Sequence, residues 1–192
     1  MKTILREINN VKIALLKVDD LIHEIPQKKI RESKFSTKRI IEKYGIQTLL
    51  AKFLPNEEII YNDNGKPFLL SNSHFISISH NAEWIGLAWS STKNIGLDIE
   101  HCQPKIERIS SRFLHVDEIA FAVTIADKTT IWCIKECLVK LLDNKKIDFK
   151  NELRTIKTDN QNWKGYSTLN LEKVYSFVIF QENNSLICIN TN

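Results

Sequence analysis

The chain has 192 residues, of which 27 are Lys or Arg and 23 are Asp or Glu, so its formal net charge is +4. Apolar residues make up 43% of the sequence and include nine Phe and four Trp. This composition excludes disorder for most of the chain and suffices for one large or two small domains. The small charge excess, with acids interspersed, argues against a nucleic-acid-binding protein.

The sequence is typical of a cytoplasmic protein. Charged residues interrupt the first twenty positions, unlike a signal peptide, and no run elsewhere approaches the ~18 apolar residues of a membrane span. The four cysteines form no CxxC pair, which indicates free thiols in a reducing compartment. We therefore expect a cytoplasmic location and no membrane partner.

The first half of the chain alternates between strand-like and helix-like periodicity. Apolar spacing predicts a strand over 11–18 and a helix over 27–53. A turn follows at 62–65, where Asn and Gly tolerate positive φ. Three short strands with hairpin-like separations come next, at 75–79, 84–90 and 94–100.

The second half is predicted to be helical first and then β-rich. Residues 104–126 indicate helix in two pieces with a break near Leu114 and His115, and 130–142 form the clearest helix of the sequence. From residue 147 onward, strands alternate with polar turns. The class is therefore α+β with antiparallel sheet.

Positive charge gathers in the predicted helix at 27–53. Between residues 28 and 52 there are eight basic residues and only two acidic ones, Glu32 and Glu42. Such a segment attracts an anionic small ligand, although a solvated helix face has the same composition.

Two carboxylates share one face of the strand at 94–100. Alternate residues of a strand point the same way, so Asp98 and Glu100 lie opposite Leu97 and Ile99. Carboxylates held this close repel one another unless a cation or a proton intervenes, and such hard oxygen ligands suit Mg²⁺. An amphipathic strand with one wet face remains the alternative.

The helix at 130–142 has an apolar stripe and a polar opposite side. A helical wheel places Trp132, Glu136 and Lys140 away from the stripe, with Lys135 beside them. Glu136 and Lys140 could form a simple i,i+4 ion pair. A large aromatic side chain on this side usually covers a second layer of structure, a partner or a ligand, so Trp132 argues against a plain ion-pair face. The apolar stripe consists of Ile131, Ile134, Leu138, Leu141 and Leu142.

Five short motifs follow one another between residues 60 and 142. They are GKP at 65–67, SISH at 77–80, IGLDIEH at 95–101, RFLHVDE at 112–118 and WCIKECLVK at 132–140. Each is weak alone, but in this order and spacing they resemble the 4′-phosphopantetheinyl transferases, specifically the larger surfactin-synthetase-activating type. The resemblance implies a transferase-like α+β fold of two similar halves, with antiparallel sheets packed as a pseudo-dimer. Residues 1–92 would contact the nucleotide of coenzyme A, and 93–192 would hold the metal and catalytic motifs.

The same resemblance implies an Mg²⁺-dependent reaction. The 4′-phosphopantetheine arm of coenzyme A would pass to a serine of an apo acyl or peptidyl carrier protein, releasing adenosine 3′,5′-bisphosphate. Asp98, Glu100 and Glu136 occupy the family's metal positions, and Lys140 matches a lysine near the diphosphate. Glu118 matches a glutamate proposed as general base. Glu118, Glu136 and Lys140 are thus the expected catalytic residues.

Residues expected to bind coenzyme A come from several motifs. Lys66 matches the GKP lysine, and Ser79 and His80 match the strand-end pair near a phosphate. Lys135 is expected to support the site or contact phosphate. Lys28, Lys29 and Arg31 lie roughly where relatives bind the 3′-phosphate, although no sharp motif fixes their register.

One position departs from the family pattern. Gln47 stands where many similar proteins have an arginine, and Arg39 or Lys43 could replace that contact. The departure concerns the nucleotide side of the site rather than the metal side.

Two other functions compete with the transferase. A non-catalytic module binding coenzyme A or a carrier protein could keep the same motifs. A metal-dependent phosphodiesterase could use three carboxylates and a lysine, but it would need a longer basic track or stacking aromatics. We expect coenzyme A and an acidic carrier protein as partners and a monomeric state. The carrier could serve fatty-acid, polyketide or nonribosomal-peptide synthesis.

Overall fold

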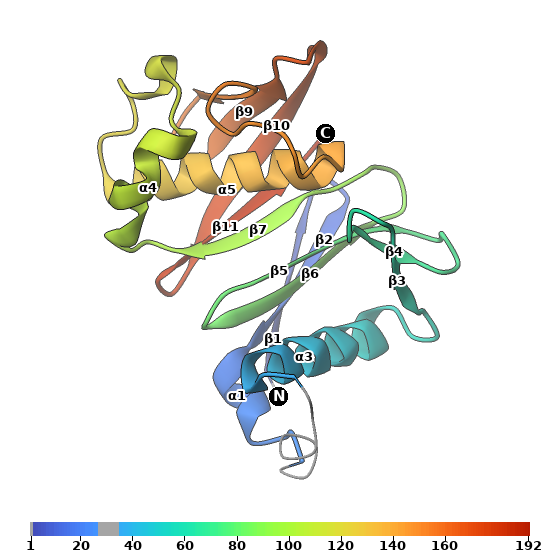
Figure 1. Ribbon diagram of the computed structural model, residues 1–192. Coiled ribbons are helices and arrows are strands. Elements are labelled where there is room, and N and C mark those ends of the chain that lie inside the picture. Colours follow the sequence, from blue (N-terminus) through green and yellow to red (C-terminus); the bar gives the residue numbers. More distant parts are fainter. Residues whose placement is uncertain (1, 27–34) are drawn as a thin grey trace.

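The computed structural model describes residues 2–26 and 35–192. Figure 1 shows two antiparallel sheets with helices on them and a small hairpin beside the first sheet. The four-stranded sheet has the order β1-β2-β6-β5, the five-stranded sheet has the order β7-β11-β10-β9-β8, and β3 and β4 form the hairpin. The predicted α+β class with antiparallel sheets is confirmed.

Most strands of the N-terminal half are short. Their bounds are β1 Thr3–Ile8, β2 Val11–Lys17, β3 Ile59–Tyr61, β4 Pro67–Leu69, β5 Phe75–His80 and β6 Trp84–Ser90. The helices of this half are α1 Val18–Ile22 and α3 Thr37–Phe53.

The C-terminal half contains the longest strand and the longest helix among the described residues. Its strands are β7 Leu97–His101, β8 Leu153–Lys157, β9 Asn162–Ser167, β10 Asn170–Glu182 and β11 Ser185–Asn190. Its helical segments are α4 Lys105–Phe113, the 3₁₀ turn η1 Val116–Glu118 and α5 Ile125–Leu142.

Three apolar cores order these elements into layers. The first lies between α3 and the four-stranded sheet, where Leu49 packs with Leu16 and Leu87. The second lies between the two sheets and joins residues of β2 and β6 to residues of β7 and β11. Because successive strand residues point to opposite faces, β2 can supply Leu16 to one core and Leu15 to the other.

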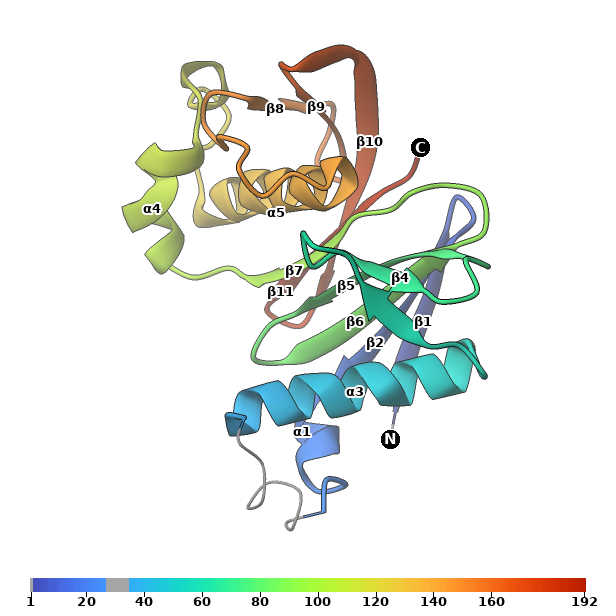
Figure 2. The same ribbon diagram turned by 45° about the vertical axis from the view of Figure 1, so that its right-hand side comes forward.

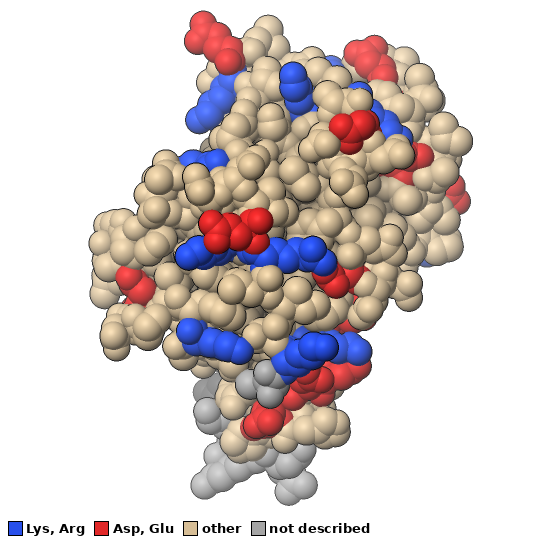
Figure 3. All heavy atoms as spheres, turned by 180° about the vertical axis from the view of Figure 1, so that it is seen from behind, with Lys and Arg blue, Asp and Glu red and all other residues tan. Residues whose placement is uncertain are grey.

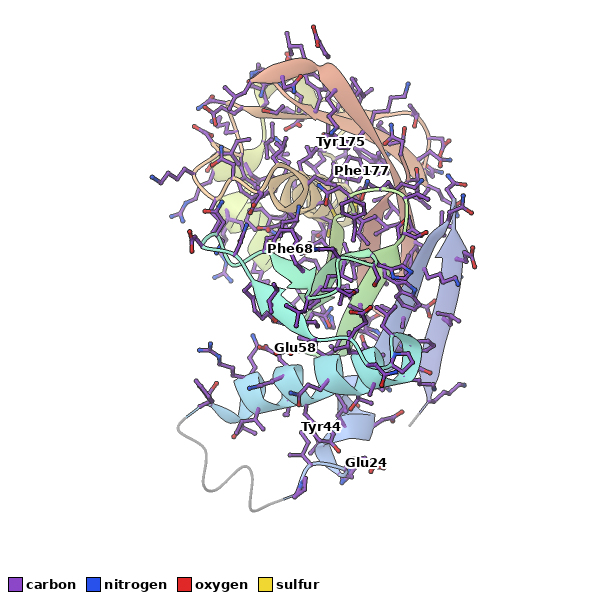
Figure 4. All side chains as sticks on the ribbon, turned by 90° about the vertical axis from the view of Figure 1, so that its right-hand side faces the viewer. Glu24, Tyr44, Glu58, Phe68, Tyr175 and Phe177 are labelled. Carbon is purple, nitrogen blue, oxygen red and sulfur yellow. The ribbon has the colours of Figure 1, made fainter. Side chains whose placement is uncertain are left out.

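The third core lies between the five-stranded sheet and its helices. Ile134 and Leu138 of α5 pack there with Phe177 and Tyr175 of β10. Figure 4 shows these two aromatic residues within the C-terminal half, whereas the labelled Glu58 lies at the base of the β3–β4 hairpin, next to α3. The layer order is therefore helix, sheet, sheet, helix, as the turned view in Figure 2 also shows.

The edge strands β5 and β7 join the two sheets through side chains. Ser77 Oγ accepts a hydrogen bond from the Leu97 N–H at 2.9 Å, and Ser79 Oγ accepts one from the Ile99 N–H at 3.1 Å. The strand that carries the predicted metal ligands is thereby fixed on both sides, since β11 pairs with it on the other edge.

Several predicted elements differ from the structure. The strands predicted at 84–90 and 94–100 do not form a hairpin, because β7 crosses into the second sheet and pairs with β11. The predicted helix at 27–53 is observed from Thr37, after Ser36, whose hydroxyl accepts from the Arg39 N–H, and residues 27–34 lie outside the described part.

The C-terminal predictions also need adjustment. The helix predicted at 130–142 begins earlier, at Ile125, because Thr124 and Asp127 form a capping box. The second helical piece expected before residue 126 is only the short turn η1. The strand predicted from 147 starts at Leu153, and β1 and β9 were not predicted.

The molecular surface carries charges of both signs. On the face shown in Figure 3, Lys and Arg side chains lie among Asp and Glu side chains. Among the described residues, no helix has both the length and the hydropathy to cross a membrane.

Candidate active site

A large cleft lies between the helices of the two halves. Its volume is about 1360 Å³, and α3, the β3–β4 hairpin, β5 and α5 all contribute to its walls. Figure 2 shows how the hairpin stands between α3 and α5 at this side of the molecule. Four of the five motifs singled out from the sequence contribute residues to this cleft, whereas the motif at 112–118 contributes none.

One face of α3 forms a basic wall of the cleft. Arg39, Lys43 and Gln47 all line it, as their i,i+4,i+8 spacing requires. The Arg39 guanidinium stands 4.7 Å from the centroid of the Phe35 ring. Both cations proposed to replace the missing arginine therefore share the wall with Gln47. The predicted contacts at Lys28 and Arg31 lie outside the described residues.

His80 lines the cleft at the end of β5. Its Nδ1 lies 3.2 Å from Glu42 Oε1 of α3. Burial lowers the pKa of His80, and the neighbouring Glu42 carboxylate opposes that shift. In the sequence Glu42 stands out only as an acid in a basic segment, and no local pattern predicts its contact with His80.

Asp98 is the most enclosed acid of the predicted metal set, with 5% of its surface exposed. Its Oδ1 accepts hydrogen bonds from Lys140 Nζ at 2.9 Å and from Ser79 Oγ at 3.0 Å. Its Oδ2 is buried and has no hydrogen-bond partner among the described residues. A buried carboxylate oxygen without a donor is costly, so Asp98 is suited to a further positive ligand.

Close packing of α5 on β7 places Asp98 under the helix. A Cβ at Gly96 would stand 2.5 Å from the backbone oxygen of Cys137. Only glycine therefore fits just before β7, and the helix can approach the strand closely.

Glu136 and Glu100 interact electrostatically with Asp98. Burial raises the pKa of Glu136 to about 7, with Asp98 and Glu100 adding to the effect and Lys140 opposing it. Burial also raises the pKa of Glu100, and Asp98 again contributes. Glu136 lines the cleft. The alternation predicted for this strand is confirmed, but the buried Asp98 does not fit the alternative of a wet face.

Lys140 connects the carboxylates to the cleft. Besides Asp98, its Nζ donates to the Leu97 carbonyl oxygen at 2.6 Å, and its side chain remains 28% exposed. Burial lowers the pKa of Lys140, but Asp98 and other negative groups outweigh it, so the pKa lies above its ordinary value. The ammonium group is therefore a persistent positive charge at the cleft wall.

The donor set fits a hard divalent cation, although the side chains do not enclose one. Within residues 2–26 and 35–192, no group of three or more His, Cys, Asp or Glu is arranged to hold a metal ion. The orphaned Asp98 Oδ2 and the raised pKa values of Glu100 and Glu136 are what a cation would relieve.

Lys135 and Glu118 form a second ion pair away from the cleft. Lys135 Nζ donates to Glu118 Oε2 and to the Phe113 carbonyl at 2.6 Å each, and to the Phe149 carbonyl at 2.9 Å. Both side chains are almost fully buried. The helical-wheel placement of Lys135 beside the polar side is therefore wrong, because α4 and the loop before β8 cover that part of α5.

Glu118 uses both carboxylate oxygens inside the protein. Oε2 also accepts from the His115 N–H, and Oε1 accepts from the Thr155 N–H and hydroxyl. Trp132 lies in the same region, stacked on Phe149 and edge-on to Phe113. Of the alternatives left open for Trp132, namely a second layer of structure, a partner or a ligand, the structure shows the second layer.

Ser79 and Lys66 have different surroundings. The buried Ser79 hydroxyl is engaged with Asp98 and Ile99 and is not among the residues that line the cleft. Lys66 lines the cleft, and its Nζ donates to Asn94 Oδ1 at 3.0 Å. Burial lowers the pKa of Lys66, while Asp143 opposes the shift.

Sequence reasoning missed several cleft residues on loops. Asn64, Asp143 and Lys145 all line it, together with Glu42 of α3. The segment 62–65 carried only a turn signal, and nothing local marked its contact with the end of α5. Long-range proximity of this kind has no signature in local periodicity.

One family model matches the C-terminal half of the chain. The family model of the 4′-phosphopantetheinyl transferase superfamily matches residues 94–189, which is half of the chain. The chain therefore belongs to the 4′-phosphopantetheinyl transferase superfamily. No curated protein matches the chain in a direct sequence search.

Proposed function

We propose that this protein transfers the 4′-phosphopantetheine arm of coenzyme A to a serine of an apo carrier protein. Membership of the superfamily supports a transferase of this type. The observation that carries the assignment to this cleft is the meeting of two groups of charges there. Glu136 and Lys140 line the cleft from α5, with Asp98 bound to Lys140 and buried behind them, and the cations Arg39 and Lys43 line it from α3.

The proposed reaction is a phosphoryl transfer. The serine Oγ forms a bond to the phosphorus that carries pantetheine, and the bond from that phosphorus to the bridging diphosphate oxygen breaks. The serine proton leaves to a base, and adenosine 3′,5′-bisphosphate departs with the bridging oxygen. Holding both reactants in line provides much of the acceleration in such reactions.

The cleft residues would divide the work of binding. Arg39, Lys43 and Lys66 would hold phosphates of the nucleotide, and His80 would contact a phosphate from the end of β5. Lys140 would stabilise the charge that develops on the leaving phosphate, because its ammonium group is fixed by Asp98 and the Leu97 carbonyl.

Asp98, Glu100 and Glu136 would hold a Mg²⁺ ion. When bound, this ion would neutralise diphosphate charge and favour departure of the leaving group. Asp98 Oδ2, which lacks a hydrogen-bond donor among the residues described, would be its first protein ligand.

Glu118 and Lys135 act in this proposal as positioning residues rather than as reacting groups. Glu118 could accept a serine proton only by giving up hydrogen bonds to Lys135, His115 or Thr155. The pair ties α5 to η1 and β8. Ser79 would likewise orient Asp98 instead of binding coenzyme A. The proton acceptor would then be a carboxylate or water near Glu136.

The proposal extends to partners and architecture. We propose an acidic acyl or peptidyl carrier protein as acceptor and a monomeric enzyme of the surfactin-synthetase-activating type. The two helix-covered sheets, which pack back to back, support a pseudo-dimeric arrangement of the halves.

Intact-mass analysis tests the proposed reaction directly. An apo acyl carrier protein is incubated with coenzyme A, Mg²⁺ and the protein, and an EDTA sample runs in parallel. We expect a gain of one phosphopantetheine mass that EDTA abolishes and that Glu136→Gln abolishes without loss of folding. Glu172→Gln, an exposed acid near the start of β10, is the matched control and should transfer normally.

The alternatives predict other results. Measurable coenzyme A binding without any mass gain across several carrier types would favour a non-catalytic binding module. Hydrolysis of a simple phosphodiester, with no transfer to any carrier, would favour the phosphodiesterase.

A further inference from the structure

The tip of the β3–β4 hairpin reaches across the cleft to the end of α5. Asn62 Nδ2 donates to Asp143 Oδ2 at 2.6 Å, and Asn64 Nδ2 donates to the Asp143 carbonyl oxygen at 2.9 Å. Asp143 directly follows α5, and it has left-handed backbone geometry with φ of 53°. Residues from the two halves of the chain therefore meet at this point.

The same asparagine organises the turn that carries Lys66. Asn62 Oδ1 accepts from the Lys66 N–H at 2.8 Å, and the backbone of Asn62 pairs with Lys66 and Gly65. Gly65 has φ of +71°, a conformation that side chains disfavour. The Oδ1 atom of Asn62 thus stabilises the turn, and its Nδ2 atom binds Asp143.

Lys66 is tied to α5 by a second route. Its Nζ donates to Asn94 Oδ1, and Asn94 Nδ2 donates to the Leu141 carbonyl oxygen at 3.0 Å. Hydrogen bonds therefore connect both the backbone and the ammonium group of Lys66 to the C-terminal end of α5. This helix also carries Glu136 and Lys140.

The Asp143 carboxylate provides a negative charge near Lys66. Among the described residues, the two side chains that donate hydrogen bonds to Asp143 are neutral amides, and neither neutralises its carboxylate. Burial lowers the pKa of Lys66, and the Asp143 carboxylate opposes this effect. An ammonium group that hydrogen bonds fix in place is what a phosphate site requires.

We propose that Asn62 and Asp143 are positioning residues that latch the hairpin to α5 and thereby hold Lys66 for a phosphate of the bound substrate. That the substrate is coenzyme A rests on the proposed function. The contact between the hairpin and α5 does not depend on the identity of the substrate, because it is formed by residues of the two halves of the chain.

A swap of the two functional groups tests the latch. Asn62→Asp places two carboxylates against each other but still offers an acceptor to the Lys66 N–H. Asp143→Asn in the same chain restores one amide and one carboxylate, and Asn also tolerates the left-handed backbone at 143. We expect Asn62→Asp to weaken coenzyme A binding roughly 10- to 100-fold, the range for losing a hydrogen bond to a charged group. The swapped pair should recover to within about threefold.

Three readouts separate positioning from mere loss of stability. In isothermal titration, the affinities for coenzyme A and for adenosine 3′,5′-bisphosphate should fall in Asn62→Asp and recover in the swapped pair. In Asn62→Asp, KM for coenzyme A should rise while KM for the carrier protein stays constant. In a Lys66→Met background, Asn62→Asp should add little further loss, because both changes remove the same contact. Asp63→Asn, a neighbour in the same turn, is the matched control and should bind normally.

The outcomes distinguish the two proposals. Wild-type protein that binds neither ligand would refute the proposed function and the role of Lys66 with it. Wild-type binding that Asn62→Asp leaves unchanged would overturn the latch alone, as would equal losses in the Lys66→Met and wild-type backgrounds.

Discussion

Helix α5 contributes two lysines, five residues apart, to two very different ion pairs. Lys135 and Glu118 are sealed in the protein, and both groups have further hydrogen-bond partners there. Lys140 and Asp98 stand at the cleft wall, where Lys140 is partly exposed and one oxygen of Asp98 has no donor among the described residues. A buried ion pair whose hydrogen bonds are all satisfied stabilises the fold, whereas a pair with an unsatisfied oxygen beside a cleft can bind a ligand.

The largest effect on stability is expected at the sealed pair. Lys135→Ala leaves the buried Glu118 carboxylate without its cation, which should cost about 3–5 kcal/mol of unfolding free energy. Urea denaturation measures the loss. Lys128→Ala on the same helix is the control, because its ion pair with the exposed Glu107 should contribute only about 0–1 kcal/mol. Equal losses in the two variants would contradict the distinction between sealed and open pairs.

At the open pair the main loss should be in rate. Lys140→Ala removes the positive charge beside Asp98, and we expect the transfer rate to fall on the order of 100- to 1,000-fold. Because this site opens to the cleft, water can replace the ammonium group, and stability should fall less than in Lys135→Ala. Single-turnover transfer and a melting curve measure both quantities. Lys146→Ala, an exposed lysine in the loop after α5, should change neither. A variant that unfolds while keeping its rate would reverse the roles of the two pairs.

The contact between α5 and β7 depends on a glycine that no other residue can replace without strain. Gly96→Ala forces a Cβ against the Cys137 backbone oxygen, and we expect a loss of about 1–3 kcal/mol. Gly45→Ala in α3 is the control, because its Cβ would meet only the movable side-chain ends of Ile85 and Leu21. Urea denaturation of both variants measures how much unfolding free energy each one loses. A larger loss at position 96 would show that the contact with the Cys137 backbone is rigid. A smaller loss at position 96 than at position 45 would show that α5 can shift from β7.

The open site should also make stability depend on pH. Burial and then Asp98 raise the pKa of Glu136 from 4.5 to about 7, so ionising it destabilises the folded state. This contribution is favourable below pH 4.5 and is lost as the pH rises through 7. In EDTA at pH 8, Glu136→Gln should therefore melt higher than wild type, by about 2–4 °C for each kcal/mol of relief. The difference should shrink towards pH 4.5. Identical melting curves from pH 4.5 to 8 would show that Glu136 is not strained by its neighbours.

Local sequence signals predicted the elements that carry the open site. Period-two alternation placed Asp98 and Glu100 on one face of a strand, and helical spacing placed Glu136 and Lys140 on one side of α5. These signals sufficed because each depends on residues only a few positions apart.

Other features depend on distant segments and could not be predicted in this way. The partner of β7 is β11, some 90 residues later, whereas sequence spacing favoured the nearby β6. Lys135 appeared outward on a helical wheel, but α4 and Phe149 enclose it. The contact between Glu42 and His80 likewise joins two elements that share no local pattern.

The serine bridges between β5 and β7 have a consequence for association with other chains. The unpaired N–H groups of an exposed edge strand can pair with a strand of another chain, which promotes aggregation. On β7, hydroxyls of Ser77 and Ser79 already occupy the N–H groups of Leu97 and Ile99. On the edge strand β8, the Glu118 carboxylate occupies the N–H of Thr155 in the same way. Side chains that arrange the site thus also shield the sheet edges against unwanted partners.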